Sequence, residues 1–322
     1  MNTNIQALLP QHSKLLEAAL QLEPGSARIE VQCLLQAVLQ VNRAWLLTHP
    51  EQSLDADQHA RYMTMLERRL GGEPIAYMLG EREFYGLNFK VTTATLIPRP
   101  ETELLVELAL QRIPASLSPL TLDVTTSHST RLPKDGSQVA GYAGEGGRQA
   151  GRGKKFRVLD LGTGSGAIAL CIAHARPGVE VVAVDASQQA LQVARENAQR
   201  LNLGNVRLLR SDWFSALCGE HFDLIVSNPP YVAADDAHLT QGDLRFEPRS
   251  ALASGADGLD DIRRICAQAM VHLNPGGWLM LEHGYNQAAQ VRTLMQQTGY
   301  SGVFSARDLS GIERVSGGSR LP

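Results

Sequence analysis

The sequence is poor in the features that mark secreted, membrane-bound and metal-binding proteins. Its four cysteines, Cys33, Cys171, Cys218 and Cys266, are scattered without metal-ligand spacing, which favours reduced, buried thiols over a disulfide framework. No apolar run approaches the ~18 residues that a transmembrane helix needs. The N-terminus also lacks the basic-then-apolar layout of a signal peptide. We therefore predict a cytoplasmic protein that binds no metal.

An excess of charge of one sign is also missing. The chain carries 30 lysines and arginines against 33 aspartates and glutamates, a formal net charge of −3. A general nucleic-acid scaffold is usually basic, so this balance counts against one. With 322 residues, of which 43% are hydrophobic, the chain is long enough for two domains and a large core.

Residues 222–231, Phe-Asp-Leu-Ile-Val-Ser-Asn-Pro-Pro-Tyr, have the clearest chemical signature in the sequence. Their apolar centre is typical of a buried parallel strand. Pro229 and Pro230 end that strand, because neither has an N–H and both have a fixed φ. The strand therefore ends in a stiff polar tip, at the edge where open α/β sheets bind ligands.

This tip offers two hydrogen-bond acceptors beside an aromatic ring. The acceptors are the amide oxygen of Asn228 and the carbonyl of Pro229, and Tyr231 supplies the ring and a hydroxyl. Such a set suits a planar, conjugated NH2 group, whose two hydrogens it can hold while charge builds up on the nitrogen, without a general base. Asn-Pro is also a common turn starter, so the tip alone leaves a plain strand-ending turn equally open.

A glycine-rich turn between a buried strand and an apolar helix is predicted within residues 156–170. Its glycines alternate and do not fit the G-x-G-x-x-G spacing of dinucleotide-binding loops. Glycine lets the backbone approach a ligand at a helix N-terminus. A buried acid at Asp160 would repel phosphate, which favours S-adenosylmethionine over NAD. The candidate cofactor-binding residues here are Asp160, Gly162, Thr163, Gly164, Ser165 and Gly166.

Acidic residues follow the next two predicted strands. Asp185 ends a strand about 20 residues beyond the glycines, where an acid suits ribose hydroxyls. Ser187 can cap the following helix, so Asp185 need not do so. After the strand at residues 206–210, Asp212 could accept from an adenine amino group and Trp213 could wall its ring. Helix capping and core packing are the plain alternatives, but ligand groups at four successive strand ends are less expected by chance than any single motif.

The rest of the chain frames this predicted α/β sheet. We predict a helical domain at residues 1–70, with Pro24-Gly25 between its first two helices. A hairpin linker spans residues 71–92, with strands near 75–80 and 83–91. A third domain covers residues 93–322, in which residues 114–155 form a flexible surface insertion.

Two further segments of the third predicted domain bear on the site. The stiff segment around Arg99 and Glu101 predicts either a helix cap by Thr102 or Glu101, or a wall of the cofactor site. Later we expect a polar loop at 241–248, helices near 258–273 and 287–299, a strand at 278–282 and a final hairpin around 308–314.

The glycine loop and the tetrapeptide Asn228 to Tyr231 resemble class I S-adenosylmethionine methyltransferases that act on planar amines. The tetrapeptide is shared by adenine-N6 DNA methyltransferases and protein-glutamine N5 methyltransferases. Residues 72–77, 97–103 and 242–248 resemble the bacterial peptide chain release factor glutamine methyltransferases, as do the helical N-terminal region and the hairpin. The resemblance covers nearly the whole chain except residues 114–155.

The resemblance implies a Rossmann-like class I methyltransferase sheet with helices on both faces, after an all-α N-terminal domain and a β-hairpin linker. It implies methylation of N5 of the glutamine in the Gly-Gly-Gln motif of release factors. We separately expect a monomer. Gly162 to Gly166, Asp185 and Trp213 would contact the cofactor, together with Asp160 and Asp212. Asn228 would contact cofactor and substrate, while Pro229, Pro230 and Tyr231 would hold the glutamine amide, with Arg99 and Glu101 on the substrate side.

Three other functions are weighed against this one. Methylation of a ribosomal-protein glutamine is disfavoured by the stretch from Arg99 to Thr102. Adenine methylation of flipped DNA bases is disfavoured by the lack of a target-recognition domain and by the net charge of −3. A non-catalytic module that senses the cofactor or binds release factors is disfavoured by the intact acceptor at Asn228 and the intact glycine loop.

Overall fold

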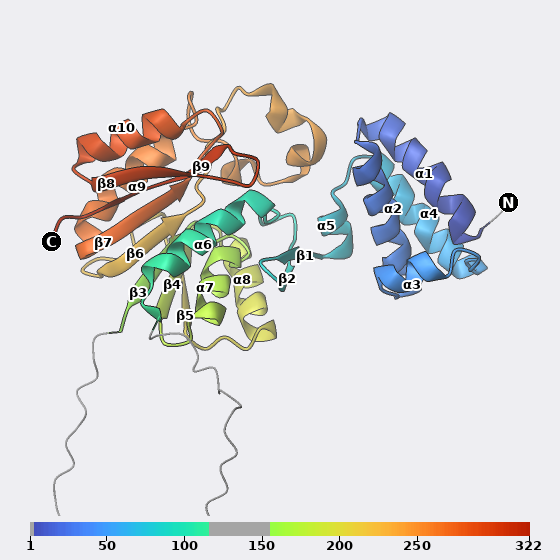
Figure 1. Ribbon diagram of the computed structural model, residues 1–322, viewed down its shortest axis with the longest axis horizontal. Helices are drawn as coiled ribbons and strands as arrows, with labels where there is room; N and C mark the ends of the chain where they lie inside the picture. The colour runs from blue at the N-terminus through green and yellow to red at the C-terminus, as the bar shows by residue number, and fades with distance from the viewer. Residues whose placement is uncertain (1–2, 116–154) are drawn as a thin grey trace, which may run out of the picture.

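The chain folds into a helical N-terminal region and a mixed sheet covered by helices, which lie side by side in Figure 1. The computed structural model describes residues 3–115 and 155–322. The predicted insertion at 114–155 therefore lies almost entirely outside the described residues. None of the helices in these two ranges is both long and apolar enough to cross a membrane.

The N-terminal region packs its helices around a core of its own. The helices are α1 (Ile5–Leu20), α2 (Pro24–Leu39), α3 (Arg43–Thr48) and α4 (Ala56–Leu70). Tyr62 and Leu66 of α4 are fully buried in this core. The prediction that Pro24-Gly25 separates two helices is wrong in detail, because both residues belong to the first turn of α2, where the fixed φ of proline is favourable. The short helix α3 is not among the predicted elements.

The linker contains a helical turn where a strand is predicted. Residues 75–80 do not form a strand: α5 (Ile75–Leu79) is a helix, and Gly80 ends it with a left-handed φ of 74°. The amides of Tyr77 and Met78 donate to the carbonyl of Pro74, which starts the turn. Short apolar runs do not distinguish helix from strand. The hairpin itself is confirmed, as β1 (Glu81–Phe84) pairs antiparallel with β2 (Leu87–Lys90).

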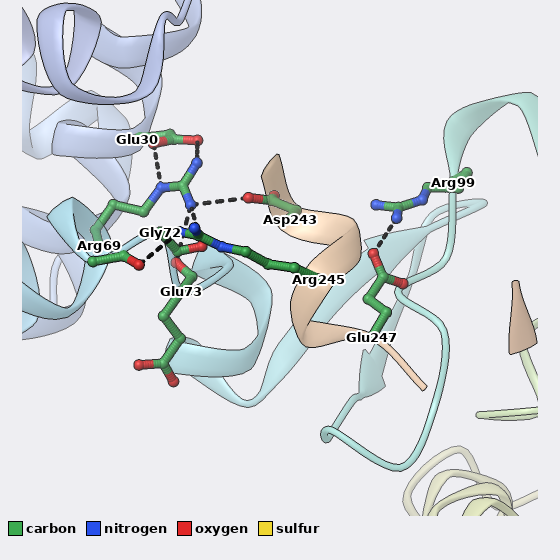
Figure 2. A network of polar contacts seen from close by, with 9 residues as sticks. Glu30, Arg69, Gly72, Glu73, Arg99, Asp243, Arg245 and Glu247 are labelled. Carbon is green, nitrogen blue, oxygen red and sulfur yellow. Dashed lines mark hydrogen bonds and ion pairs between the residues drawn. The ribbon is translucent and has the colours of Figure 1, made fainter. Parts of the chain in front are cut away.

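A polar network joins the helical region to a loop of the sheet region (Figure 2). Arg69, at the end of α4, donates to both carboxylate oxygens of Glu30 at 2.7 and 2.9 Å and to Asp243 at 2.9 Å. Asp243 lies in the short helix η4 (Gly242–Phe246), as does Arg245, which donates to the carbonyl of Gly71 at 2.7 Å. The end of α4 is thereby tied to the loop that follows the strand β6 (Phe222–Ser227).

Within the described residues, the main sheet has the order β5-β4-β3-β6-β7-β9-β8. Its strands are β3 (Arg157–Leu161), β4 (Glu180–Asp185), β5 (Val206–Arg210), β6 (Phe222–Ser227), β7 (Leu273–Glu282), β8 (Ser301–Arg307) and β9 (Glu313–Ser319). The pairs from β5 to β7 are parallel, whereas β9 is antiparallel to both of its neighbours, which confirms the final hairpin.

The strand β7 begins earlier than predicted. The expected start was at residue 278, but the strand begins at Leu273 and its register against β6 shifts between Phe222 and Leu224. Residues 274–277, which lie outside the predicted strand, therefore form a bulge inside β7. Bulges of this kind accommodate glycine and proline that a regular ladder would not.

Helices cover both faces of the sheet. On one face α6 (Glu103–Arg112), α7 (Ala167–Ala175) and α8 (Gln188–Arg200) pack against the buried side chains of Val158, Val181 and Leu224. On the other face α9 (Asp260–His272) and α10 (Ala288–Thr298) pack against Leu159 and Ile225. Neighbouring residues of one strand thus serve opposite cores. The prediction of an α/β sheet with helices on both faces is confirmed.

Candidate active site

A pocket of about 450 Å³ opens at the carboxyl ends of β3, β4, β5 and β6. Ten of the residues predicted for the site line it, namely Arg99, Gly162, Thr163, Gly164, Ser165, Asp185, Asp212, Trp213, Asn228 and Pro230. Five others do not, namely Asp160, Gly166, Glu101, Pro229 and Tyr231. The four predicted strand ends therefore converge on one cavity, as parallel strands require.

The three alternating glycines of the loop do different work. All three have a positive φ, which residues other than glycine rarely adopt. A Cβ on Gly162 would lie 3.3 Å from the ring of Trp213, and a Cβ on Gly166 would lie 2.9 Å from Leu170 of α7. Nothing lies within 4 Å of a Cβ built on Gly164. Gly162 thus makes room inside the pocket, whereas Gly166 avoids a clash with the Leu170 side chain of the helix that it precedes.

Asp160 places an incompletely partnered acid directly beneath this loop. It is fully buried, and its Oδ2 accepts from the Thr163 hydroxyl at 2.7 Å and from the Ala169 amide at 3.2 Å. Its Oδ1 has no hydrogen-bond partner. Burial raises the pKa of Asp160 to about 7. A positive charge in the adjacent pocket would stabilise the ionised form of this carboxyl group.

Asp185 lines the pocket and also braces the glycine loop. Its Oδ2 accepts from the Gly164 amide at 2.9 Å, and its Oδ1 accepts from the Ser187 amide at 2.8 Å. Ser187 caps α8, with its hydroxyl accepting from Ala190 at 3.2 Å, so the predicted cap is confirmed. Each carboxylate oxygen of Asp185 can accept a further hydrogen bond from a ligand hydroxyl.

Trp213 is held rigidly at one wall of the pocket. Its backbone has a φ of 49°, and its indole Nε1 donates to Asp261 of α9 at 3.1 Å. The neighbouring Asp212 forms a bidentate pair with Arg264 at 2.9 and 2.8 Å. Asp261 and Arg264 also line the pocket but are not among the predicted site residues. Both residues belong to α9, and no local sequence motif marks them as site residues.

Asn228 is fixed at the pocket by one hydrogen bond from its amide nitrogen. Nδ2 donates to the hydroxyl of Thr102 at 3.1 Å, and among the described residues no donor bonds to Oδ1. Thr102 precedes α6, but the predicted cap by Thr102 or Glu101 is wrong, because neither side chain caps the helix. The Thr102 hydroxyl bonds to the Asn228 amide instead, and this contact leaves the amide oxygen as the available acceptor.

Tyr231 lies next to the pocket-lining Pro230 but does not itself line the pocket. Its hydroxyl donates to Oε1 of Glu282 at 3.2 Å, and its carbonyl accepts from the Gln287 side chain at 3.0 Å. Gly258 packs so closely that a Cβ there would lie 2.2 Å from the same carbonyl. Contacts with Glu282, at the end of β7, and with Gln287 therefore fix the position of Tyr231. Glu282 is buried and is not among the predicted site residues.

The stiff segment around Arg99 forms a wall of the pocket, to which Pro98 and Arg99 both contribute. Arg99 pairs with Glu247 (Figure 2). The Oε2 atom of Glu247 also accepts from the Ile97 amide at 3.0 Å. The next residue, Pro248, lines the pocket as well. The polar loop at 241–248 thus contacts Arg69 through Asp243 and the pocket wall through Glu247.

Known proteins match this chain over most of its length. A family model described as the PrmC N-terminal domain matches residues 8–80, and one described as the methyltransferase small domain matches residues 149–248. The release factor glutamine methyltransferase of Bordetella pertussis is 46% identical over 92% of this chain and 96% of its own. The enzyme of that name from Salmonella typhimurium is 43% identical over 95% of this chain and 97% of its own.

A solved structure shares the fold at low sequence identity. The hMettl16 catalytic domain, in complex with MAT2A 3′UTR hairpin 6, is 13% identical and covers 83% of this chain and 85% of its own, with a TM-score of 0.51. The sheet, its helices and the family model define a class I methyltransferase fold. From its similarity to the two relatives, the chain belongs to the release factor glutamine methyltransferase family.

Proposed function

We propose that this protein transfers a methyl group from S-adenosylmethionine to the side-chain nitrogen N5 of the glutamine in the Gly-Gly-Gln motif of bacterial peptide chain release factors. The names of its relatives support this substrate. The observation that carries the proposal is the Asn228 amide, whose nitrogen bonds to Thr102 and whose oxygen has no partner among the described residues. An acceptor at the pocket is what a substrate NH2 group requires.

The pocket fits the proposed cofactor. Gly162 leaves space that a Cβ would reduce, and Trp213 borders that space with an aromatic ring. Asp185 offers acceptor capacity for ribose hydroxyls, and the buried Asp160 carboxyl group favours a cation nearby. A volume of about 450 Å³ is within the usual range for small-molecule sites. When bound, S-adenosylmethionine supplies an electrophilic methyl group on a sulfonium.

The residues of the tip position and polarise the glutamine amide. In this proposal Asn228 Oδ1 and the Pro229 carbonyl accept the two N–H bonds of the substrate. Among the described residues no backbone amide donates to the Pro229 carbonyl. Two acceptors hold the nitrogen in line and favour positive charge on it as it attacks, which lowers the barrier without a general base. The proton leaves to water after transfer.

The helical region is proposed to dock the release factor. Residues 1–70 would form the docking domain, residues 71–92 the linker and residues 93–322 the methyltransferase domain. Pro230 and Arg99 line the pocket. We propose that they surround the glutamine-bearing segment of the release factor, together with Pro229, Tyr231 and Glu101. We further propose that the enzyme acts as a cytoplasmic monomer, and its net charge of −3 supports the absence of DNA as a partner.

Replacement of Asn228 by alanine tests the assignment. Loss of one preorganised polar group at a reacting centre lowers kcat by about 10²- to 10³-fold. The dissociation constant of S-adenosylhomocysteine should change far less, because Gly162, Asp185 and Trp213 remain. Ser250, which lines the same pocket, provides the control variant Ser250→Ala. An Asn228→Ala enzyme that turns over like the wild type would remove Asn228 from the mechanism.

A further inference from the structure

A buried carboxyl group lies behind the catalytic tip and does not enter the mechanism described so far. Glu282 is the last residue of β7. Ser227 of β6 pairs with Leu281 of β7, so the next residues of the two strands, Asn228 and Glu282, lie at the same edge of the sheet. Glu282 is 1% exposed. Its Oε1 accepts from the Tyr231 hydroxyl at 3.2 Å, whereas its Oε2 has no hydrogen-bond partner.

Thr102 lies between this carboxyl group and Asn228. Its hydroxyl oxygen accepts from Nδ2 of Asn228 at 3.1 Å. A hydrogen bond from the Thr102 side chain is also among the causes that lower the pKa of Glu282. A hydroxyl has a single hydrogen. If Thr102 gives this hydrogen to Glu282, it can act toward Asn228 only as an acceptor.

We propose that Glu282 is a positioning residue, whose ionised carboxylate takes the hydroxyl hydrogens of Thr102 and Tyr231 and thereby sets the orientation of the Asn228 amide. A carboxylate only accepts hydrogen bonds, so an ionised Glu282 fixes the donor and the acceptor in each hydrogen bond that connects it to Asn228. Asn228 must turn its nitrogen to Thr102 and its oxygen to the substrate. The opposite orientation would present an NH2 group to the NH2 group of glutamine, and two donors form no hydrogen bond.

The charge state of Glu282 gives this arrangement a pH dependence. Burial raises the pKa of Glu282 to about 7, with a smaller contribution from Glu101 on η1 (Pro100–Thr102), while Thr102, Tyr231 and Arg314 of β9 lower it. A protonated carboxyl group can donate, so it no longer requires the hydrogen of Thr102. Because the working form is the ionised one, kcat should fall as the pH drops through this pKa.

The inference rests on the proposed function, and the test uses the full-length enzyme with release factor as acceptor. Glu282→Gln keeps the shape of the side chain but adds a donor that can bond to the Thr102 oxygen. We expect kcat to fall about tenfold or more, and the acid limb of its pH profile to flatten. The dissociation constant of S-adenosylhomocysteine should stay within about twofold, since Glu282 does not line the pocket. Glu313→Gln on β9, whose partner is Arg292, is the matched control and should keep full activity.

Thr102 variants separate this role from plain packing. Thr102→Val is isosteric and removes the hydroxyl, so it should lose as much kcat as Glu282→Gln, and the double variant should lose no more than either single one. Thr102→Ser restores the hydroxyl and should recover most of the loss. Thermal unfolding should show all variants folded; if Glu282→Gln fails to fold, the comparison of Thr102→Val with Thr102→Ser decides.

The outcomes distinguish the two proposals. A wild-type enzyme that methylates release factor, together with a Glu282→Gln variant within twofold of it at every pH, overturns the positioning role alone. Equal activity of Thr102→Val and Thr102→Ser overturns it as well. A wild-type enzyme that leaves release factor unmethylated overturns the proposed function and this inference with it.

Discussion

Arg69 allows a direct test of how the helical region is held, because one buried guanidinium bonds to several segments. Its side chain is 3% exposed. It donates to both oxygens of Glu30, to the carbonyls of Gly72 and Glu73 at 3.2 and 3.1 Å, and to Asp243 (Figure 2). Arg69→Met keeps most of the apolar stem and removes every one of these bonds. The carboxylate of Glu30 is then left without its cation.

The expected loss of stability follows from this burial. Removing one partner of a buried ion pair costs about 3–5 kcal/mol, because the other charge stays uncompensated. Glu30 is 19% exposed and keeps some access to water, so we expect the lower end, about 3 kcal/mol. The neighbouring Arg68 is a matched control. Its side chain is 46% exposed in its pair with Glu73, so Arg68→Met should cost about 0.5 kcal/mol.

The assay is amide hydrogen exchange, combined with urea denaturation followed by circular dichroism. Exchange reports the local free energy of opening, so α4 and β6 can be followed separately. Arg69→Met should reduce protection in α4 by about 3 kcal/mol and leave β6 nearly unchanged. A change in α4 no larger than that caused by Arg68→Met would refute the reasoning that this ion pair stabilises the helical region.

Three further predictions concern the link to the pocket and the pocket itself. Asp243→Ala removes the loop's side-chain bond to Arg69, so steady-state kinetics should show KM for release factor raised about fivefold, with the affinity for S-adenosylhomocysteine unchanged; an unaltered KM would contradict a docking role. Asp185→Ala should weaken the binding of S-adenosylhomocysteine, measured by calorimetry, about tenfold or more, because a ribose acceptor and the hydrogen bond to the Gly164 amide are both lost. An unchanged affinity would exclude a role for Asp185 in cofactor binding. Burial raises the pKa of Asp160 to about 7, so lowering the pH from 8 to 6 protonates this carboxyl group and should weaken S-adenosylmethionine by about 1 kcal/mol. S-adenosylhomocysteine, which has no sulfonium, should change less; equal shifts would exclude a charge effect.

The central strands and the ligand-bearing strand ends could be predicted because their signals are local. An apolar run that is followed by glycines, or by Asn228 and two prolines, indicates both the strand and the point where it ends within about ten residues. The α5 segment could not be predicted, because five apolar residues fit a strand equally well. The bulge in β7 depends on pairing with β6, which no local pattern contains.

The polar partners of the site depend on contacts between distant parts of the chain. Thr102 and Asn228 are 126 residues apart, and Arg69 and Asp243 are 174 residues apart. From the sequence, Thr102 looks like a helix cap, and only the folded structure shows that its hydroxyl bonds to the side chain of Asn228. Glu282 ends the predicted strand at 278–282, as Asp185 ends another, but its position next to Asn228 follows only from the pairing of β6 with β7.

The central claim is tested most directly by methyl transfer from labelled S-adenosylmethionine to three acceptors in parallel. These are purified release factor, the same factor with alanine in place of the Gly-Gly-Gln glutamine, and duplex DNA. The account predicts label on the wild-type release factor alone. Label on DNA, or on neither protein nor DNA, would contradict it and direct attention to ribosomal-protein glutamines or to a binding role without catalysis.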